Sequence, residues 1–216
     1  MGSRVGMQVE SSRDLRAAAL FAMGLLFLAR NDTLHGIFLD HVSWGPKGMR
    51  LFEAKHKKHG DLAGARVMFT PWATCKGPLT IIKKWTDYLE YSTPPGQRWS
   101  LWRLPTGGAT VPTRADLLEI IKFAVQKSGC HVPFGFRVDL HMLRATGGCH
   151  GFALRIPPPT LCCRGGWDKL SSLDAYARPV ISGNTAFQFF GHLLDVLCAD
   201  VVLPSSRGCS GVPGIS

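Results

Sequence analysis

Residues 141 to 176 read HMLRATGGCHGFALRIPPPTLCCRGGWDKLSSLDAY. The segment opens on His141 and Arg144, and residues three positions apart are neighbours on the surface of a helix. It closes on Gly165-Gly166-Trp167, followed nine residues later by Tyr176. A proton-transfer group beside a fork-shaped cation suits a phosphodiester. The stretch therefore predicts a helix that carries chemical groups, a glycine turn, and a short polar segment ending on a tyrosine.

The composition is that of a globular chain with a strong positive charge. Hydrophobic residues make up 45% of the 216 residues and charged residues only 19%, which excludes a disordered polypeptide. Twenty-five Lys and Arg against fifteen Asp and Glu give a net charge of +10. Such a balance favours a polyanionic partner, either nucleic acid or an acidic membrane surface.

The cysteines predict a reducing, intracellular environment with free thiols. Their number, seven, is odd, no pair has C-x-x-C spacing, and the adjacent Cys162 and Cys163 do not readily bridge to each other. Cys130-His131 and Cys149-His150 contain zinc-binding atoms, but their spacing matches no recognised zinc motif. The chain also has no P-loop and no carboxylate cluster, which is consistent with a reaction that requires no metal and no nucleotide cofactor.

The apolar run from Ala17 to Ala29 is predicted to be a buried helix. It is too short to span a bilayer, and although its length is that of a signal-peptide core, no A-x-A cleavage pattern follows it. Ser12 is a plausible N-cap, and a helix that is hydrophobic on nearly all sides belongs in the middle of a core. We therefore expect no membrane association.

Periodicity and turn signals predict a mainly α fold with a small antiparallel β-hairpin or three-stranded sheet. Strands are expected at 49–54 and 65–70, joined by a basic connection, and 92–112 is expected to be a long loop whose Trp99 and Trp102 tuck onto the core. Besides the buried helix, further helices are expected at 33–40, 78–91, 113–127 and 139–154, and Gly129 is expected to end the third of these. A helical turn is expected at 160–163, the start of another helix or a flexible segment at 171–176, and a last apolar helix at 185–202. Residues 1–12 are read as a polar lead-in, 13–203 as one domain, and 204–216 as a flexible tail.

These residues resemble the active-site signature of the tyrosine recombinases, the phage-integrase family. In that family a first arginine follows a buried helix, and Phe27-Leu28-Ala29-Arg30 followed by Leu39-Asp40-His41-Val42 resembles this block. The family then places a lysine on a β-hairpin, where Lys55 is the best match and Lys57 and Lys58 are competitors. His141, Arg144, Trp167 and Tyr176 complete the set, and the spacing from Trp167 to Tyr176 is the usual one for the family.

The resemblance, which covers about residues 14–179, implies a catalytic domain that breaks and rejoins DNA through a covalent 3′-phosphotyrosyl link. Tyr176 is then the nucleophile, and His141 accepts its proton. Arg30 and Arg144 stabilise the charge that builds on the phosphate oxygens, because arginine stays protonated and binds such oxygens bidentately. The expected role of Lys55 is to protonate the departing 5′ oxygen, and the indole N–H of Trp167 can only donate, here to phosphate.

The sequence departs from the family pattern at several points. The position three after Arg30, often an acidic buttress, is Thr33, for which Asp32 is a candidate substitute. The prolines at 157–159 are unusual for the family. The N-terminal helical domain that closes a clamp around duplex DNA is also expected to be missing, because residues 1–12 alone precede the first core helix.

Three alternatives remain open at this point. A type IB topoisomerase shares the nucleophilic chemistry, although those enzymes typically carry lysine where this chain has His141. An inactive DNA-binding remnant of a mobile element is favoured by Thr33 and by the missing clamp. A basic interaction domain predicts that Arg30, His141, Arg144 and Tyr176 do not converge.

The partners implied by the resemblance are double-stranded DNA and further copies of the chain, assembled on DNA as a dimer or tetramer. Residues 185–202 are expected to pack in trans on a neighbouring protomer. The protein is expected inside the cell with DNA, in the nucleus of a eukaryote or in the cytoplasm and nucleoid of a bacterium. Integration, excision and inversion are not distinguished by the sequence.

Overall fold

The structure, a computed structural model, describes residues 11–53, 66–104, 111–127, 132, 137–167 and 169–181. Three strands form its sheet: β1 (Val42–Gly45), β2 (Gly48–Glu53) and β3 (Arg66–Pro71). The α-helices are α1 (Ser12–Phe27), α2 (Asn31–His35), α3 (Trp72–Ser92), α4 (Arg114–Lys127), α5 (Leu140–Ala153), α6 (Pro158–Gly165) and α7 (Asp174–Ile181). The expectation of a mainly α fold with a small antiparallel sheet is confirmed.

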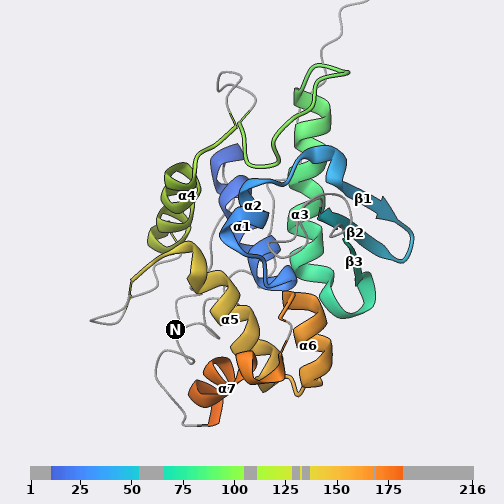
Figure 1. The fold of residues 1–216 in the computed structure, drawn as a ribbon. Coiled ribbons are helices and arrows are strands. Elements are labelled where there is room, and N and C mark those ends of the chain that lie inside the picture. Colours follow the sequence, from blue (N-terminus) through green and yellow to red (C-terminus); the bar gives the residue numbers. More distant parts are fainter. Residues whose placement is uncertain are drawn as a thin grey trace, which may run out of the picture.

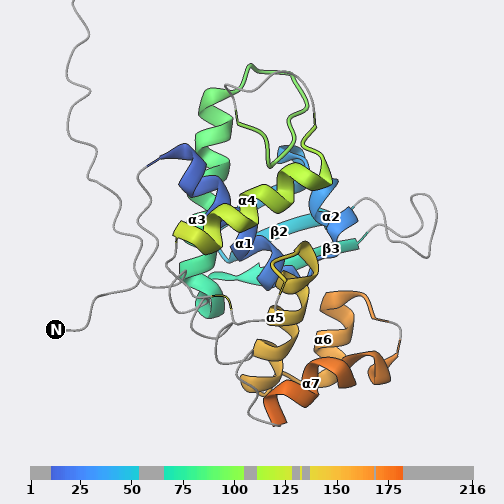
Figure 2. The same ribbon diagram turned by 90° about the vertical axis from the view of Figure 1, so that its left-hand side faces the viewer.

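Helix α1 lies at the centre of the molecule and is covered on several sides. It packs against α3, α4 and α5, and the sheet lies beyond α3 on the side away from α4 (Figure 1). Viewed from the side, α4 crosses in front of α1, while α6 lies beside α5 and α7 lies at the lower end of α5 (Figure 2). None of the described helices is long and apolar enough to span a lipid bilayer.

The ends of α1 differ slightly from the prediction. Its N-cap is Ser11 rather than Ser12, because a capping box needs a partner three residues on and Asp14 meets this spacing only for Ser11. The Ser11 hydroxyl accepts from the Asp14 N–H at 3.2 Å, and the Asp14 carboxylate accepts from the Ser11 N–H at 3.0 Å. The helix ends at Phe27 rather than Ala29, since Leu28 adopts a left-handed conformation with φ 50°.

The sheet has the order β1-β2-β3 with antiparallel pairing throughout. Both predicted strands are present within one residue of their expected ends, and β1 is an additional strand that the sequence analysis did not delimit. Alternate residues of β2 and β3 point inward, including Met49, Leu51 and Met68, which join the core. Glu53 continues this inward series at the end of β2.

Two predicted helices have different bounds. The helix expected at 33–40 is wrong in its extent: α2 ends at His35, Gly36 follows as its C-cap, and Leu39–His41 forms a separate 3-10 turn. Helix α3 begins at Trp72 rather than Pro78, with a kink at Cys75. Because Pro78 lacks an N–H, it can sit in a helix only where a regular bond is given up, and the kink supplies that position.

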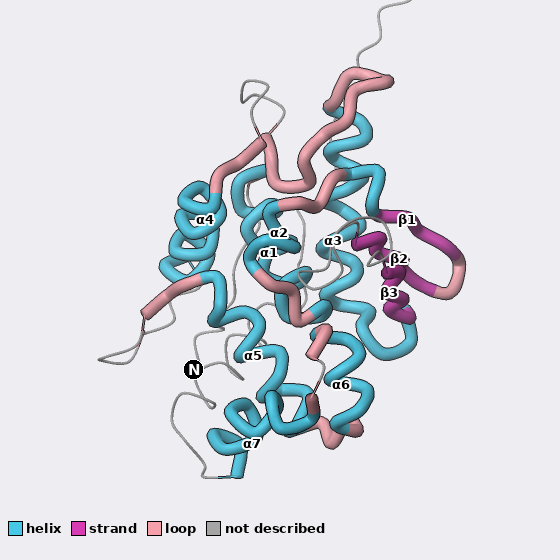
Figure 3. Tube along the Cα trace, in the orientation of Figure 1, coloured by secondary structure: helices cyan, strands magenta, loops and turns pink. Residues whose placement is uncertain are grey.

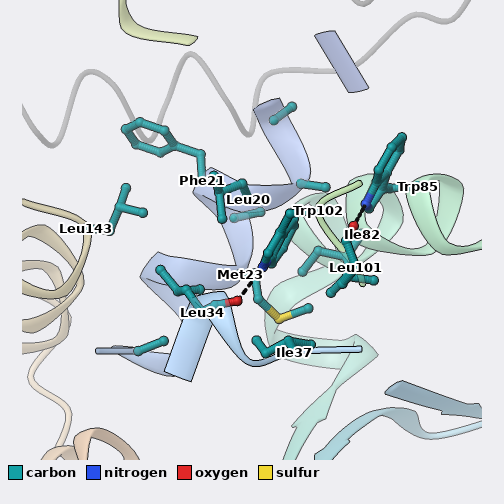
Figure 4. Close-up of a cluster of buried hydrophobic side chains, with 14 of the residues drawn as sticks. Leu20, Phe21, Met23, Leu34, Ile37, Ile82, Trp85, Leu101, Trp102 and Leu143 are labelled. Atoms are coloured by element: carbon teal, nitrogen blue, oxygen red, sulfur yellow. Dashed lines mark hydrogen bonds between the residues drawn. The ribbon is translucent and has the colours of Figure 1, made fainter. Parts of the chain in front are cut away.

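The loop that follows α3 turns back toward the centre of the molecule (Figure 3). As predicted, Trp99 and Trp102 are buried, at 6% and 0% exposure. The indole N–H of Trp102 donates to the Leu34 carbonyl at 2.5 Å, and that of Trp85 donates to the Leu101 carbonyl at 2.7 Å (Figure 4). The two indoles therefore fill the core and satisfy backbone carbonyls of α2 and of the loop.

The C-terminal helices follow the predicted order with shifted bounds. Asp139 caps α5 by accepting from the Met142 N–H at 2.8 Å. The prolines at 157–159 cap and begin α6, which extends from Pro158 to Gly165 rather than covering only 160–163. Of the two alternatives expected at 171–176, the start of a helix is observed: a 3-10 turn, Leu170–Leu173, leads into α7, which begins at Asp174. Gly129, the 54–65 connection and the helix expected at 185–202 lie outside the described residues.

Candidate active site

Arg30 stands at the junction between α1 and α2. Leu28 turns the chain out of α1, and Arg30 then takes an extended conformation as the N-cap of α2. Its guanidinium Nη2 donates to the carbonyl of Gly166 at 3.4 Å. Gly166 follows α6 in a left-handed conformation with φ 62°, which glycine adopts without a steric penalty. Arg30 is thereby tied to the turn that carries Trp167.

Arg144 is held between the end of α1 and the indole of Trp167. Its side chain is only 4% exposed, and its Nη1 donates to the Leu28 carbonyl at 2.6 Å. The guanidinium carbon lies 3.9 Å from the centre of a Trp167 ring, within range of a cation–π interaction. The unusual backbone of Leu28 thus has a consequence at the site, because it leaves a carbonyl outside the regular α1 bonding pattern that Arg144 binds.

Tyr176 lies between Trp167 and His141. Its ring centre is 5.2 Å from that of Trp167 and 6.5 Å from that of His141. The Tyr176 and Trp167 side chains are half-buried and His141 is exposed, so the phenol lies beside groups that solvent can reach. The imidazole and the indole lie next to the phenol, the Arg144 guanidinium lies against the indole, and Arg30 binds the turn that precedes it. Together these groups can bind a tetrahedral phosphate and remove a proton from a phenol.

Of the six residues singled out from the sequence, four are joined by ring contacts: His141, Arg144, Trp167 and Tyr176. Arg30 reaches the same part of the molecule through its bond to Gly166, the residue before Trp167. The non-convergence expected for a basic interaction domain is therefore not observed. Lys55 and its competitors Lys57 and Lys58 lie outside the described residues.

An acidic residue that the sequence analysis missed lies beside the Arg30 helix. Thr33 Oγ1 donates to Glu53 Oε1 at 2.7 Å, and Glu53 is only 5% exposed. Asp32, the substitute suggested from the sequence, is exposed. A carboxylate from β2 is thus bound to Thr33, the residue that stands three positions after Arg30. The sequence did carry a signal: Glu53 follows Met49 and Leu51 at intervals of two residues, so it faces inward on the same side of the strand.

Arg164 fixes α6, the helix that leads into Gly166 and Trp167. Its Nη2 donates to Thr70 Oγ1, and its guanidinium lies 5.5 Å from the Phe27 ring centre. Burial lowers the pKa of Arg164, while the nearby Cys75 opposes that shift. An arginine remains charged even so, which adds a third cation to this part of the molecule.

Within the described residues, no three His, Cys, Asp or Glu side chains gather in a way that could hold a metal ion. Cys149 and His150 from the zinc alternative are both on α5, whereas Cys130 and His131 lie outside the residues described.

Comparisons with known proteins show similarity of fold. The sequence matches no known family and no curated protein. The structure is similar to the site-specific recombinase XerH in a post-cleavage complex with palindromic difH substrate, with a TM-score of 0.59 and 13% identity over 88% of this chain. It is also similar to XerH in a pre-cleavage complex with difH substrate, with a TM-score of 0.59 and 14% identity over 82% of this chain.

The chain spans about half the length of these recombinase chains, 48% of the first and 47% of the second. At this identity the likeness establishes a tyrosine recombinase-like fold: mostly helical, with a three-stranded antiparallel sheet.

Proposed function

We propose that this chain is a tyrosine recombinase-like catalytic domain that cleaves and rejoins DNA strands. The observation that carries the proposal is the placement of Tyr176 against Trp167 and His141, with the Arg144 guanidinium 3.9 Å from the centre of the same indole. The fold shared with XerH, solved before and after cleavage of its substrate, supports it. The proposed catalytic domain spans residues 13–203, followed by a tail at 204–216.

The proposed reaction begins with attack of Tyr176 Oη on a backbone phosphorus. A phenol has an ordinary pKa of about 10, so it needs an acceptor for its proton, and His141 is that acceptor. Arg30 and Arg144 bind the non-bridging oxygens, whose negative charge is greater in the transition state than in the ground state, and Trp167 donates its indole N–H to phosphate.

The bond from phosphorus to the 5′ oxygen then breaks, and Lys55 supplies the proton that the 5′ oxygen takes up. The product is a 3′-phosphotyrosyl link and a free 5′ hydroxyl. Attack by a 5′ hydroxyl on this link returns the proton and releases Tyr176. Each bond broken is replaced by one of similar energy, so the cycle needs no nucleotide cofactor.

The proposed partner is duplex DNA, on which copies of the chain assemble as dimers or tetramers. The net charge of +10 favours a polyanion. Binding that neutralises several phosphates releases counterions, so the affinity for DNA is expected to fall steeply as salt concentration rises. The proposal places the protein inside the cell, associated with DNA of a mobile element.

The experiment that tests this function is a covalent-trapping assay with nicked duplexes, drawn from a pooled library or from DNA flanking the source gene. A nick next to the scissile phosphate lets the cleaved piece leave, so the protein–DNA adduct accumulates and is scored on a denaturing gel. We expect an adduct with wild type and none with Tyr176→Phe, in which the nucleophilic oxygen is absent.

Tyr91→Phe is the matched control, because Tyr91 is 93% exposed on α3. An adduct that persists in Tyr176→Phe would show that another residue is the nucleophile. Salt-sensitive DNA binding without any adduct would support the inactive remnant instead.

A further inference from the structure

The face of α5 that carries His141 and Arg144 continues to Gly148. The three residues are spaced by three and then four positions, which places them in one stripe along a helix. A Cβ built on Gly148 would lie 3.2 Å from Cγ and 3.4 Å from Cβ of Tyr176. The Tyr176 side chain therefore packs directly against the backbone of α5. Any residue larger than glycine at position 148 would increase the distance between Tyr176 and this backbone.

The next residue, Cys149, contacts the backbone of Tyr176. Its Sγ donates to the Tyr176 carbonyl at 3.2 Å, and the cysteine is 7% exposed. Burial raises the pKa of the Cys149 thiol, so it keeps its proton and remains a donor near neutral pH. Gly148 and Cys149 together thus contact both the ring and the main chain of one residue of α7.

The same stretch of α5 is set closely against α1. A Cβ on Gly147 would lie 2.5 Å from both the Leu25 carbonyl oxygen and Leu28 Cδ2, so the two helices touch there backbone to backbone. One turn earlier, Arg144 is bonded to the Leu28 carbonyl. The distance from Arg144 to the surface that supports Tyr176 is consequently fixed by a single rigid helix.

From this geometry we infer that Gly148 and Cys149 are positioning residues, which set where the Tyr176 phenol lies relative to Arg144 and His141. The expected effect of these residues on DNA cleavage rests on the proposed function. Displacement of a reacting atom by about 1 Å can cost on the order of 100-fold in rate. A shift of a few tenths of an ångström, as a methyl group at Gly148 would impose, is expected to slow cleavage about ten-fold.

The test compares Gly148→Ala, Cys149→Ala and Cys149→Ser by three measurements. These are the single-turnover rate of adduct formation on a nicked duplex, the affinity for the same DNA, and a spectroscopic signal from Tyr176 itself. The chain has three tyrosines, so Tyr88→Phe with Tyr91→Phe leaves Tyr176 as the sole site for 3-fluorotyrosine and a single fluorine resonance. Alanine favours helix more than glycine does, so slower adduct formation by Gly148→Ala would not reflect a loss of helix propensity.

We expect Gly148→Ala and Cys149→Ala to move the fluorine resonance and to slow cleavage about ten-fold, with DNA affinity unchanged. Cys149→Ser keeps a hydrogen-bond donor and is expected to stay close to the wild-type rate. Gly45→Ala is the glycine control, because a Cβ there would meet nothing closer than 3.9 Å, and Cys163→Ala is the exposed-cysteine control.

A wild-type rate in Gly148→Ala or Cys149→Ala would overturn the inference, as would a Cys149→Ser variant as slow as Cys149→Ala. If wild type forms no adduct, the proposed function fails, and the fluorine resonance alone decides whether the two residues position Tyr176. A resonance that moves in both alanine variants supports the placement, and an unchanged one refutes it.

Discussion

The core around α1 and the group formed by α5, α6 and α7 are built in different ways. The core buries large apolar side chains such as Leu20, Phe21 and Trp85 to within 1% of full burial. The indoles of Trp85 and Trp102 donate to backbone carbonyls there. The second group has a small apolar cluster that consists of Leu28, Leu161, Cys162 and Leu173. There, Arg144 and Arg164 pack over aromatic rings and glycines allow close backbone contact.

The difference indicates that most of the stability and the proposed chemistry lie in separate parts of one fold. Buried apolar area in the core supplies most of the stabilising free energy. Charged groups next to glycine contacts fix the geometry of the second group but contribute less stabilising free energy, because burying polar groups is costly. Leu28 belongs to the second cluster and is also the C-cap of α1, so it joins the two parts.

The largest effect is expected from a truncation in the core. Leu20→Ala removes a fully buried side chain from α1 and should lower the free energy of unfolding by about 2–5 kcal/mol. Urea denaturation measures this, and adduct formation per folded molecule should be unchanged. Leu170→Ala, at a residue 55% exposed, is the control and should change stability by less than about 0.5 kcal/mol. Equal effects at the two leucines would remove the distinction between core and surface.

A substitution at Arg144 is expected to lower adduct formation strongly and stability only slightly, the reverse of Leu20→Ala. Arg144→Lys keeps the charge but loses the planar fork that can bind two phosphate oxygens, so adduct formation should fall about 100-fold or more. The midpoint of urea unfolding should move much less than in Leu20→Ala. Arg114→Lys, on the exposed side of α4, should cleave at the wild-type rate. A large loss of stability in Arg144→Lys with unchanged cleavage would reverse the proposed assignment.

A smaller effect is expected at the contact between the Arg30 helix and the sheet. Thr33→Val has nearly the same shape but removes the hydroxyl that donates to the buried Glu53 carboxylate. Loss of a hydrogen bond to a buried charged group should lower the unfolding free energy by about 1–3 kcal/mol. Thr33→Ser retains the hydroxyl, so most of the unfolding free energy lost in Thr33→Val should be kept in this variant. If Thr33→Val is as stable as Thr33→Ser, the bond to Glu53 contributes nothing.

The smallest effect concerns the pH dependence of stability at His41. Burial lowers the pKa of His41 below its ordinary value of 6.5, Asp40 opposes the shift, and Arg98, whose Nη2 lies 2.7 Å from Nε2, adds to it. Below about pH 6.5 the unfolded chain therefore binds more protons at this residue than the folded chain, so the unfolding free energy falls as pH falls. Above that pH this contribution is constant.

Urea denaturation of wild type and His41→Asn at pH 7 and pH 5 measures this contribution. Asparagine at position 41 can still accept from the Phe38 N–H, as His41 Nδ1 does at 3.4 Å, but cannot be protonated. The loss of stability between pH 7 and pH 5 should be smaller in His41→Asn than in wild type, and His35→Asn serves as the control. An identical loss in wild type and His41→Asn would contradict the pKa shift.

The amino-acid sequence by itself determined the local structure of this protein. The Thr113–Asp116 capping box, the Asp139 cap of the helix bearing His141 and Arg144, and the inward alternation of β2 depend on contacts within a few residues. Such contacts can be inferred from spacing, which is why the mainly α fold with a small sheet was predicted. The burial of Trp102 followed from its size and hydrophobicity.

Only the tertiary structure decided the partners of the site residues. Arg30 binds a carbonyl 136 positions away, Arg144 binds one 116 positions away, and Thr33 meets a carboxylate on a neighbouring strand. Backbone carbonyls are present at every residue and carry no signal in the sequence, so their availability depends on where Leu28 and Gly166 turn the chain. These contacts arise from the packing of whole elements against each other, and residue spacing alone does not encode that packing.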